Sequence, residues 1–207
     1  MNTKYEHDQI LLNLEKKLYA MEEAYKGAIQ QLIILRNQIS KEVETDDLTH
    51  LLRKGFFHER LLQMLERAEV RKSTVNVIMM DLDHFKAIND RFGHQKGDEV
   101  LETISTLVKN YLRPQDIAGR FGGEEIIVAV ECDEKIALEI AERIRKAIQQ
   151  VQFTNKDTAF TVTSSMGLAS SNTSGYHLTQ LITDADSMLY EAKHKGRNNI
   201  QTMLKAA

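Results

Sequence analysis

Four carboxylates stand at two places in the chain where metal chemistry could occur. Asp81 and Asp83 lie at the end of the apolar run over residues 75–81 (VNVIMMD), which is typical of a buried strand. Glu124 and Glu125 directly follow two glycines between short apolar runs, a pattern that indicates a tight hairpin. Ligands of α/β proteins collect where strands end, and clustered carboxylate oxygens select Mg²⁺ or Mn²⁺. For any one of these acids taken alone, the alternative is a solvated side chain at a loop tip.

Two cations near the other end of the chain could bind phosphates. Lys193 and Arg197 are four residues apart around the predicted end of a helix. Arginine offers a planar fork of donors and lysine a point charge, whereas the alternative is simply favourable charge at a helix C-terminus. Together with the acids, and without a Walker-type glycine loop, they favour a nucleotide held by its phosphates through a divalent cation. The corresponding reaction class is phosphoryl or nucleotidyl transfer.

An alternation of helical and strand patterns must position these residues, which predicts an α/β fold with a central sheet flanked by helices. Gly196 stands where the glycine that ends a helix would stand. The predicted strands are residues 75–81, 117–121, 126–130, 160–169 and 199–203. The predicted helices are residues 55–70, 90–111, 133–151 and 178–195.

The first 45 residues carry a different pattern, in which apolar residues recur at alternating spacings of three and four over four heptads. We call these residues the seam; they are Leu11, Leu14, Leu18, Met21, Tyr25, Ala28, Leu32, Leu35 and Ile39. Two parallel helices would bury the seam, and we prefer this coiled coil to a helix folded back onto its own domain. The sequence therefore predicts an N-terminal coiled-coil dimerisation helix over residues 1–45 and a globular domain over residues 46–207.

The composition excludes several other classes of protein. The 207 residues carry 27 basic and 30 acidic side chains, a net charge of −3, so no basic face is available to neutralise nucleic-acid phosphates. No apolar run approaches the roughly 18 residues of a membrane span, and the polar first nine residues are not a secretory signal. Cys132 is the single cysteine and cannot form an internal disulfide. We therefore expect a cytoplasmic protein with neither nucleic-acid nor membrane partners.

Five short blocks, in order and with the right spacing, resemble the GGDEF domain of diguanylate cyclases over residues 46 to about 200. The blocks are Asp47-Leu48-Thr49; Asp81 to Asp90 (DLDHFKAIND); Gly93 to Asp98 (GHQKGD); Gly122-Gly123-Glu124-Glu125-Ile126; and Tyr190 to Asn198 (YEAKHKGRN). The resemblance implies the nucleotidyl-cyclase-like sheet of that family. It also implies the family's activity, in which two GTP molecules on facing domains condense to cyclic di-GMP and release two pyrophosphates.

The resemblance carries the family's metal and catalytic roles onto four residues of this chain. It implies that Asp81, the backbone carbonyl of Leu82 and the acids Glu124 and Glu125 hold Mg²⁺ or Mn²⁺. Glu124 matches the residue that deprotonates the attacking 3′-hydroxyl, and Glu125 matches a metal ligand. The division of labour between these two glutamates stays open, since one carboxylate can do both.

The resemblance also implies which residues bind GTP. The expected phosphate contacts are Phe85, Lys86, Lys193 and Arg197, with Lys86 also offsetting charge in the transition state. The expected readers of guanine are Asn89 and Asp98, because a carboxylate accepts from both donors of the guanine edge and adenine offers no such pair. Capping of nearby helices is the alternative for these two residues. His94 touches the base or ribose or is a structural histidine. Asp83 supports the metal-binding residues or the fold rather than binding the metal itself.

Product inhibition is the other property that the resemblance implies. Arg113 and Asp116 have the spacing before Gly122 of the family's RxxD inhibitory site, and Arg143 resembles a second arm that a partner domain can contribute. The alternative is a loop salt bridge between Arg113 and Asp116.

Ile126 stands where phenylalanine is usual in the family, and we expect its side chain to face the core. The rival functions are an inactive domain that serves as a cyclic di-GMP receptor and a scaffold whose coiled coil is its purpose.

Overall fold

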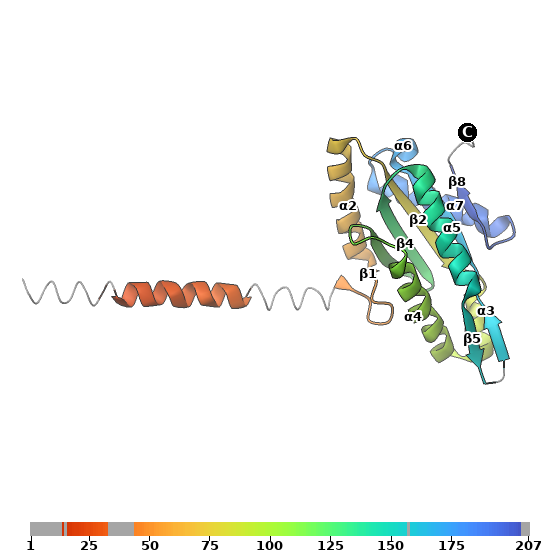
Figure 1. The fold of residues 1–207 in the computed structure, drawn as a ribbon, viewed down its shortest axis with the longest axis horizontal. Coiled ribbons are helices and arrows are strands. Elements are labelled where there is room, and N and C mark those ends of the chain that lie inside the picture. Colours follow the sequence, from red (N-terminus) through yellow and green to blue (C-terminus); the bar gives the residue numbers. More distant parts are fainter. Residues whose placement is uncertain (1–13, 15, 33–43, 157, 204–207) are drawn as a thin grey trace, which may run out of the picture. The chain divides into compact units, whose positions relative to one another are not determined.

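The computed structural model describes residues 14, 16–32, 44–156 and 158–203 (Figure 1). The chain divides into two units, Met1–Val43 and Glu44–Ala207. In the first unit residues 16–32 are helical, as the seam predicts, and expose the seam side chains Leu18, Met21, Tyr25 and Leu32. Three further seam residues, Leu11, Leu35 and Ile39, lie outside the described residues.

A six-stranded sheet forms the centre of the second unit, with the strand order β1-β3-β4-β2-β7-β8. Its central strand β2 pairs antiparallel with both β4 and β7, whereas the two edge strands pair parallel with their neighbours. A separate hairpin of two strands, β5 and β6, stands beside it. The strands are β1 (Leu52–Arg53), β2 (Val75–Leu82), β3 (Ile117–Gly122), β4 (Glu125–Glu131), β5 (Gln152–Asn155), β6 (Thr158–Thr161), β7 (Ser164–Ser170) and β8 (Ile200–Thr202).

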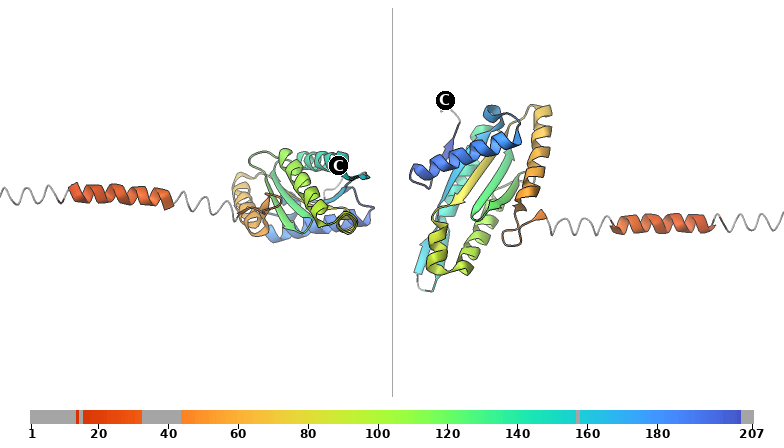
Figure 2. Two further views of the ribbon diagram at one scale, coloured as in Figure 1. Left: turned by 90° about the horizontal axis from the view of Figure 1, so that it is seen from below. Right: turned by 180° about the vertical axis from the view of Figure 1, so that it is seen from behind.

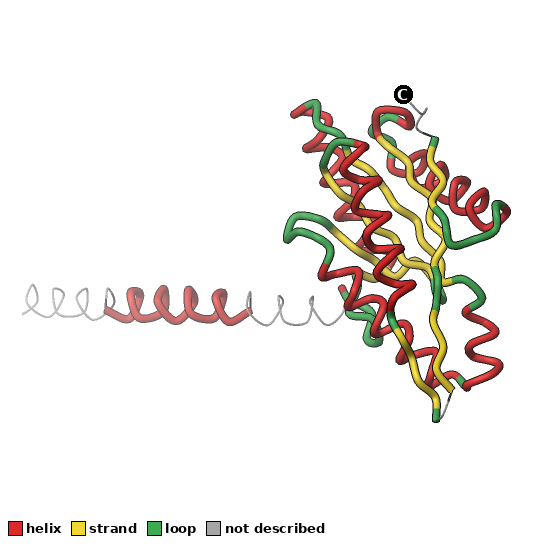
Figure 3. The backbone as a smooth tube through the Cα atoms, turned by 45° about the vertical axis from the view of Figure 1, so that its right-hand side comes forward, coloured by secondary structure: helices red, strands yellow, loops and turns green. Residues whose placement is uncertain are grey.

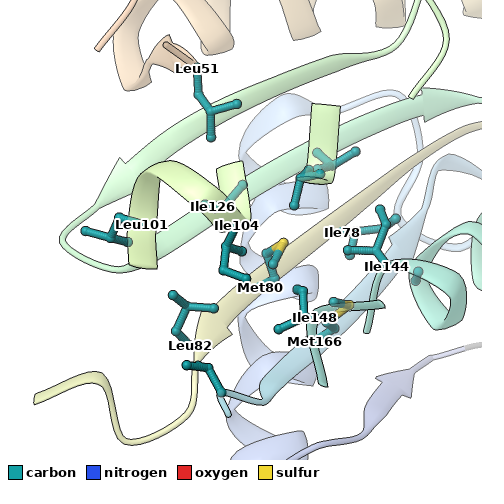
Figure 4. Close-up of a cluster of buried hydrophobic side chains, with 14 of the residues drawn as sticks. Leu51, Ile78, Met80, Leu82, Leu101, Ile104, Ile126, Ile144, Ile148 and Met166 are labelled. Carbon is teal, nitrogen blue, oxygen red and sulfur yellow. The ribbon is translucent and has the colours of Figure 1, made fainter. Parts of the chain in front are cut away.

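Helices cover both faces of this sheet, as Figures 2 and 3 show. The helices are α2 (Lys54–Arg71), α3 (Phe85–Phe92), α4 (His94–Asn110), α5 (Glu134–Gln150), α6 (Ser171–Ser174) and α7 (Leu178–His194). Alternate residues of β2 point to opposite faces. Val77 and Met79 join the core beneath α2 and α7, whereas Ile78 and Met80 join the core beneath α3, α4 and α5 (Figure 4). The predicted α/β class is therefore confirmed.

Close approach fixes the position of α7 on the sheet. A side chain added at Gly167 in the middle of β7 would overlap the α7 backbone at Ala185 and Leu189, so only glycine lets the helix sit there. The helix α7 ends as the sequence predicts, with Gly196 in a left-handed conformation at φ 99°.

No helix in the described part of the chain is long and apolar enough to cross a membrane.

Two of the predicted elements are wrong in extent. Residues 90–111 are not one helix, because Gly93, at φ 86°, separates α3 from α4 and lets the chain turn between them. Residues 160–169 are not one strand either. Thr161 ends β6, which pairs with β5 outside the main sheet, and the chain re-enters the main sheet at Ser164. Ile126 is 1% exposed and packs in the core, as predicted.

Candidate functional site

The acids of the two predicted metal-binding places meet at one end of the central strands. Asp81 near the end of β2 pairs in register with Glu125 at the start of β4, so the two carboxylates leave the same face of adjacent strands. The Asp81 carboxylate is buried, and Lys193 from α7 places its ammonium nitrogen 2.7 Å from Oδ2. Three elements that are distant in sequence thus bring two acids and one cation together.

Burial and mutual repulsion oppose ionisation of these acids. Burial raises the pKa of Asp81, and the charges of Glu124 and Asp83 raise it further, while Lys193 acts in the opposite direction. Burial also raises the pKa of Glu125, and the charges of Asp81, Asp186 and Glu124 add to the effect. A cation among these carboxylates would relieve the repulsion.

Asp186 is a member of this acidic group that the sequence analysis missed. It is an exposed residue of α7, and its charge acts on Glu125. The signal that could have found it is its spacing, since Asp186 stands seven residues before Lys193 and seven residues bring a helix back to the same face.

The donor chemistry fits a hard divalent cation. The Asp81 and Glu125 carboxylates adjoin the end of β2, and the backbone carbonyl of Leu82 could offer another oxygen there. Within residues 14, 16–32, 44–156 and 158–203, no three histidine, cysteine or acidic side chains are arranged to bind a metal ion together. In this arrangement the ammonium of Lys193, at Asp81, supplies the positive charge.

Two glycines shape the turn that carries Glu124. Gly123 adopts φ 46°, and the Glu125 carboxylate lies over Gly122, where an added Cβ would be 3.5 Å from Oε2. Arg120 holds the turn from outside, since its Nε donates to the Gly123 carbonyl at 3.0 Å and its Nη1 donates to Asp46 at 3.0 Å. The half-buried Glu124 therefore sits on a turn tied to the first residues of the second unit.

The start of α3 presents backbone donors beside the acids. Phe85 is 6% exposed and packs in the core, so its ring is directed away from solvent, whereas the Lys86 side chain is exposed. The first N–H groups of a helix have no partner within the helix. Phe85 could thus contact a phosphate through its backbone N–H, and Lys86 through its ammonium.

The turn between α3 and α4 brings together the residues predicted to read guanine. The Asn89 side chain lies against Gly97, where an added Cβ would overlap Asn89 Oδ1. His94 and Asp98 are exposed in the first turns of α4. The N-cap residues of α3 and α4 are His84 and Gly93, neither with a side-chain hydrogen bond, so the capping alternative for Asn89 and Asp98 is wrong.

Lys193 and Arg197, the two phosphate-binding cations predicted near the end of the chain, are in different environments. Lys193 is half-buried at Asp81, whereas Arg197 lies on the exposed turn beyond Gly196. The Arg197 guanidinium has no hydrogen-bond or ion-pair partner among the described residues and is available to a ligand.

The residues of the predicted inhibitory site form a second group. The Asp116 carboxylate accepts from the backbone N–H of Arg113 at 2.9 Å, which leaves the exposed Arg113 guanidinium to solvent. No Arg113–Asp116 salt bridge occurs among the described residues. Both residues line a cavity of about 450 Å³ together with Thr45 and His50. Arg143 reaches toward this region, with its guanidinium carbon 5.8 Å from the Tyr111 ring centroid.

Replacing Glu125 with glutamine is expected to raise the melting temperature in metal-free buffer by about 1–2 °C after allowance for solvent screening. The folded-state pKa of Glu125 is raised, so the native state binds the proton more tightly than the unfolded chain does. This carboxylate therefore destabilises the protein at neutral pH, and its penalty fades as the pH falls through the raised pKa. Scanning calorimetry of the variant and wild type from pH 7 downward measures the difference.

The same pair of proteins tests the cation site. Added Mg²⁺ should raise the melting temperature of the wild type more than that of Glu125→Gln, because binding to the native state stabilises it. The matched control is Glu59→Gln, an exposed glutamate on α2. An equal response of all three proteins to Mg²⁺ would rule out Glu125 as a ligand.

Comparison with known proteins identifies related chains. The family model described as "Diguanylate cyclase, GGDEF domain" matches residues 43–199. Diguanylate cyclase A of Treponema denticola is 34% identical over 178 residues, which are 84% of this chain and 48% of the relative. The response regulator PleD of Caulobacter vibrioides is 35% identical over 173 residues, 80% of this chain and 38% of the relative. The chain thus spans less than half the length of these relatives.

Solved structures share the fold over most of their length. The coiled coil and GGDEF domain of DgcB from Caulobacter crescentus, in complex with c-di-GMP, matches with a TM-score of 0.79 and 25% identity, covering 89% of this chain and 98% of that one. The active GGEEF domain of a diguanylate cyclase from Vibrio cholerae matches with a TM-score of 0.70 and 29% identity, covering 75% of this chain and 99% of that one.

Proposed function

Because the chain belongs to the diguanylate cyclase GGDEF-domain family, we propose that it condenses two GTP molecules into cyclic di-GMP. In each half-reaction the 3′-hydroxyl oxygen of one GTP forms a bond to the α-phosphorus of the other, and the bond to pyrophosphate breaks. The hydroxyl proton goes to a base, and two pyrophosphates leave per product. The observation that carries the proposal is the meeting of Asp81, Glu125 and Lys193 beside the glycine turn that holds Glu124.

The acids serve both cation binding and proton transfer in this proposal, and Glu124 takes part in both. Asp81, the Leu82 carbonyl, Glu125 and Glu124 hold Mg²⁺ or Mn²⁺, which when bound neutralises phosphate charge. The register pairing of Asp81 with Glu125 supports their assignment as ligands. Glu124 lies next along the turn and is assigned as the base that accepts the 3′-hydroxyl proton.

The surrounding residues bind the rest of GTP. The N–H of Phe85 and the ammonium of Lys86 contact phosphates at the start of α3, and Arg197 grips the terminal phosphates. The ammonium of Lys193, which contacts Asp81 in the structure, would also bind the terminal phosphates. Asn89 and Asp98 read the guanine edge, with His94 beside the base or ribose. The exposure of Asp98 and the absence of any capping role support this assignment.

The two active domains must face each other, and we assign that task to the helix of residues 1–45 in a homodimer. The exposed apolar seam between residues 16 and 32 supports dimerisation. Residues 42–47 then form a hinge that aims the domain of residues 46–207. The contacts from Asp46 through Arg120 to the Gly123 carbonyl give the end of this hinge a direct connection to the Glu124 turn. We also propose a cytoplasmic location, where the thiol of the single cysteine, Cys132, would stay reduced.

Product stoichiometry tests the reaction. Purified protein with GTP and Mg²⁺ is expected to release two pyrophosphates for each cyclic di-GMP formed, measured by coupled phosphate release and liquid chromatography. Pyrophosphate release in excess, without cyclic product, would indicate a different nucleotidyl transfer.

Replacing Arg113 with alanine is expected to weaken product inhibition by about tenfold or more, because a charge-assisted, bidentate contact is lost. In the proposal, cyclic di-GMP binds at Arg113 and Asp116 with Arg143 as a further arm, and the adjoining cavity supports this. Initial rates at increasing added cyclic di-GMP give the inhibition constant. The control is Arg67→Ala, an exposed arginine whose guanidinium meets only the Gln63 carbonyl on its own helix. Unchanged inhibition in Arg113→Ala would remove this site from the account.

A further inference from the structure

The turn that follows α7 is anchored at one residue, Asn198, by two other elements of the fold. The Asn198 backbone N–H donates to Asp83 Oδ2 at 3.0 Å, which connects the turn to the end of β2. The Arg145 guanidinium, from α5, donates through Nη1 to the Asn198 carbonyl at 3.1 Å and to its Oδ1 at 2.5 Å. The backbone and side chain of one residue are thus held from two sides.

Both anchors are themselves fixed. Asp83 is 5% exposed and accepts hydrogen bonds of 2.6 Å from Thr163 Oγ1 and from Ser165 Oγ. Arg145 forms a two-pronged pair with Glu142, in which Nε and Nη2 each donate at 2.8 Å. Such a planar, bidentate pair holds the guanidinium in one orientation. Neither anchor can shift without breaking several contacts.

The anchored turn has a conformation that the chain does not adopt readily. Gly196, Arg197 and Asn198 have φ values of 99°, 61° and 46°, all in the left-handed region. Residues with a side chain disfavour this region and hold it only where the surroundings impose it. Without its anchors the turn would relax, and the side chain of its middle residue, Arg197, would change direction.

The contacts hold the backbone around Arg197 while leaving its guanidinium available. The Arg197 N–H donates to the Ala192 carbonyl at 3.2 Å, and the next residue carries the two anchors described above. The exposed guanidinium has no partner among the described residues, and four residues earlier Lys193 contacts Asp81. A turn fixed in this way holds the backbone from which the Arg197 side chain projects, and Asp83 connects that backbone to the end of β2.

We propose that Asp83 and Arg145 are positioning residues, which hold the Asn198 turn so that Arg197 is presented to the terminal phosphates of the nucleotide. This inference rests on the proposed function, because it is the GTP phosphates that Arg197 would bind. It gives a role to Asp83, whose carboxylate accepts from the Asn198 turn, and to Arg145 on α5, whose guanidinium donates to that turn.

The test compares two neighbouring cations on α5. Arg145→Met removes both hydrogen bonds from its guanidinium to Asn198 and leaves the longer one, 3.3 Å, from Asn198 Nδ2 to Gln149. Lys146→Met is the matched control, since Lys146 also pairs with Glu142, at 3.3 Å, but does not contact the turn. We expect Arg145→Met to raise the KM for GTP about fivefold to tenfold, the effect of losing one ordinary net hydrogen bond, because Arg197 stays in place but is less well directed. Lys146→Met should leave the KM within about twofold. Affinity for GMP, which lacks the terminal phosphates, should not change.

A double-mutant cycle separates positioning from a general structural effect. If Arg145 acts through Arg197, adding Arg145→Met to Arg197→Ala should produce no further rise in KM beyond about twofold. An equal rise in both backgrounds, or an equal loss of GMP affinity, would overturn the proposal.

Hydrogen exchange distinguishes failure of this inference from failure of the proposed function. Arg145→Met should speed amide exchange at Arg197 and Asn198 at least tenfold whether or not the wild type makes cyclic di-GMP. If the wild type forms no product but binds GTP more tightly than GMP, the proposed function fails and the positioning role is judged from binding alone. Unchanged exchange at the turn would overturn the role assigned to Arg145.

Discussion

Replacing Glu124 with glutamine is expected to reduce the turnover of GTP by about 10²–10⁴-fold while leaving GTP affinity within a few fold of the wild type. Glutamine has the shape of glutamate but cannot accept the 3′-hydroxyl proton, and general-base catalysis contributes about this factor. The substitution sits on a turn that Gly123 and the contact from Arg120 already define, so the fold should persist. Steady-state kinetics and GTP titration of the purified variant measure the two quantities.

Two controls make this result specific to Glu124. Glu59→Gln on α2 removes an exposed glutamate remote from the acids and should leave turnover unchanged. Glu125→Gln should lower the affinity for Mg²⁺, so that its loss of turnover is partly recovered at high Mg²⁺, whereas that of Glu124→Gln is not. Turnover by Glu124→Gln within tenfold of the wild type would contradict its assignment as the base.

Introducing charge into the seam is expected to reduce turnover per chain by about 10²-fold at submicromolar protein concentration. Two GTP-loaded domains must meet, and a shared coiled coil gives them an effective concentration on the order of millimolar. Leu18→Lys combined with Tyr25→Lys puts two ammonium groups on the apolar stripe, and both side chains are exposed in the single chain. The substitutions thus oppose pairing of helices without disturbing the sheet domain.

The concentration dependence of the rate is the diagnostic measurement. The specific activity of the seam variant should rise steeply with protein concentration, whereas that of the wild type stays nearly constant. The control is Ala20→Lys with Gln30→Lys, which adds the same charge to the same helix at positions that face away from the seam. A seam variant as active as the wild type at every concentration would contradict dimerisation through this helix.

The central part of the fold could be predicted because its signals are local. The apolar runs predict β2 and β4, and the glycine pair between two short runs predicts the hairpin that joins β3 and β4. The register that places Asp81 opposite Glu125 comes from the structure alone. The helices flanked by clear turn residues also lie close to their predicted bounds. The predicted helix over residues 90–111 is wrong because the apolar residues keep their helical spacing on both sides of Gly93. That single glycine, and not the apolar pattern, decides where the chain turns.

The long-range contacts of the site could not be predicted from the sequence. Asp83 and Asn198 are 115 residues apart, and Asp46 and Arg120 are 74 apart, so neither pair leaves a local pattern. The contact between Lys193 and Asp81 is of the same kind. The contact between Lys193 and Asp81 depends on how α7 packs on the sheet, which is determined by shape at positions such as Gly167 rather than by the residues in contact.

The measurement that tests the central claim most directly is mass spectrometry of the products formed from GTP and Mg²⁺ over a range of concentrations of the wild-type protein. The account predicts cyclic di-GMP, formed by the wild type at all concentrations at which it is dimeric. No cyclic di-GMP at any concentration, together with tight binding of added cyclic di-GMP at Arg113 and Asp116, would contradict the claim and identify the protein as a receptor for that nucleotide.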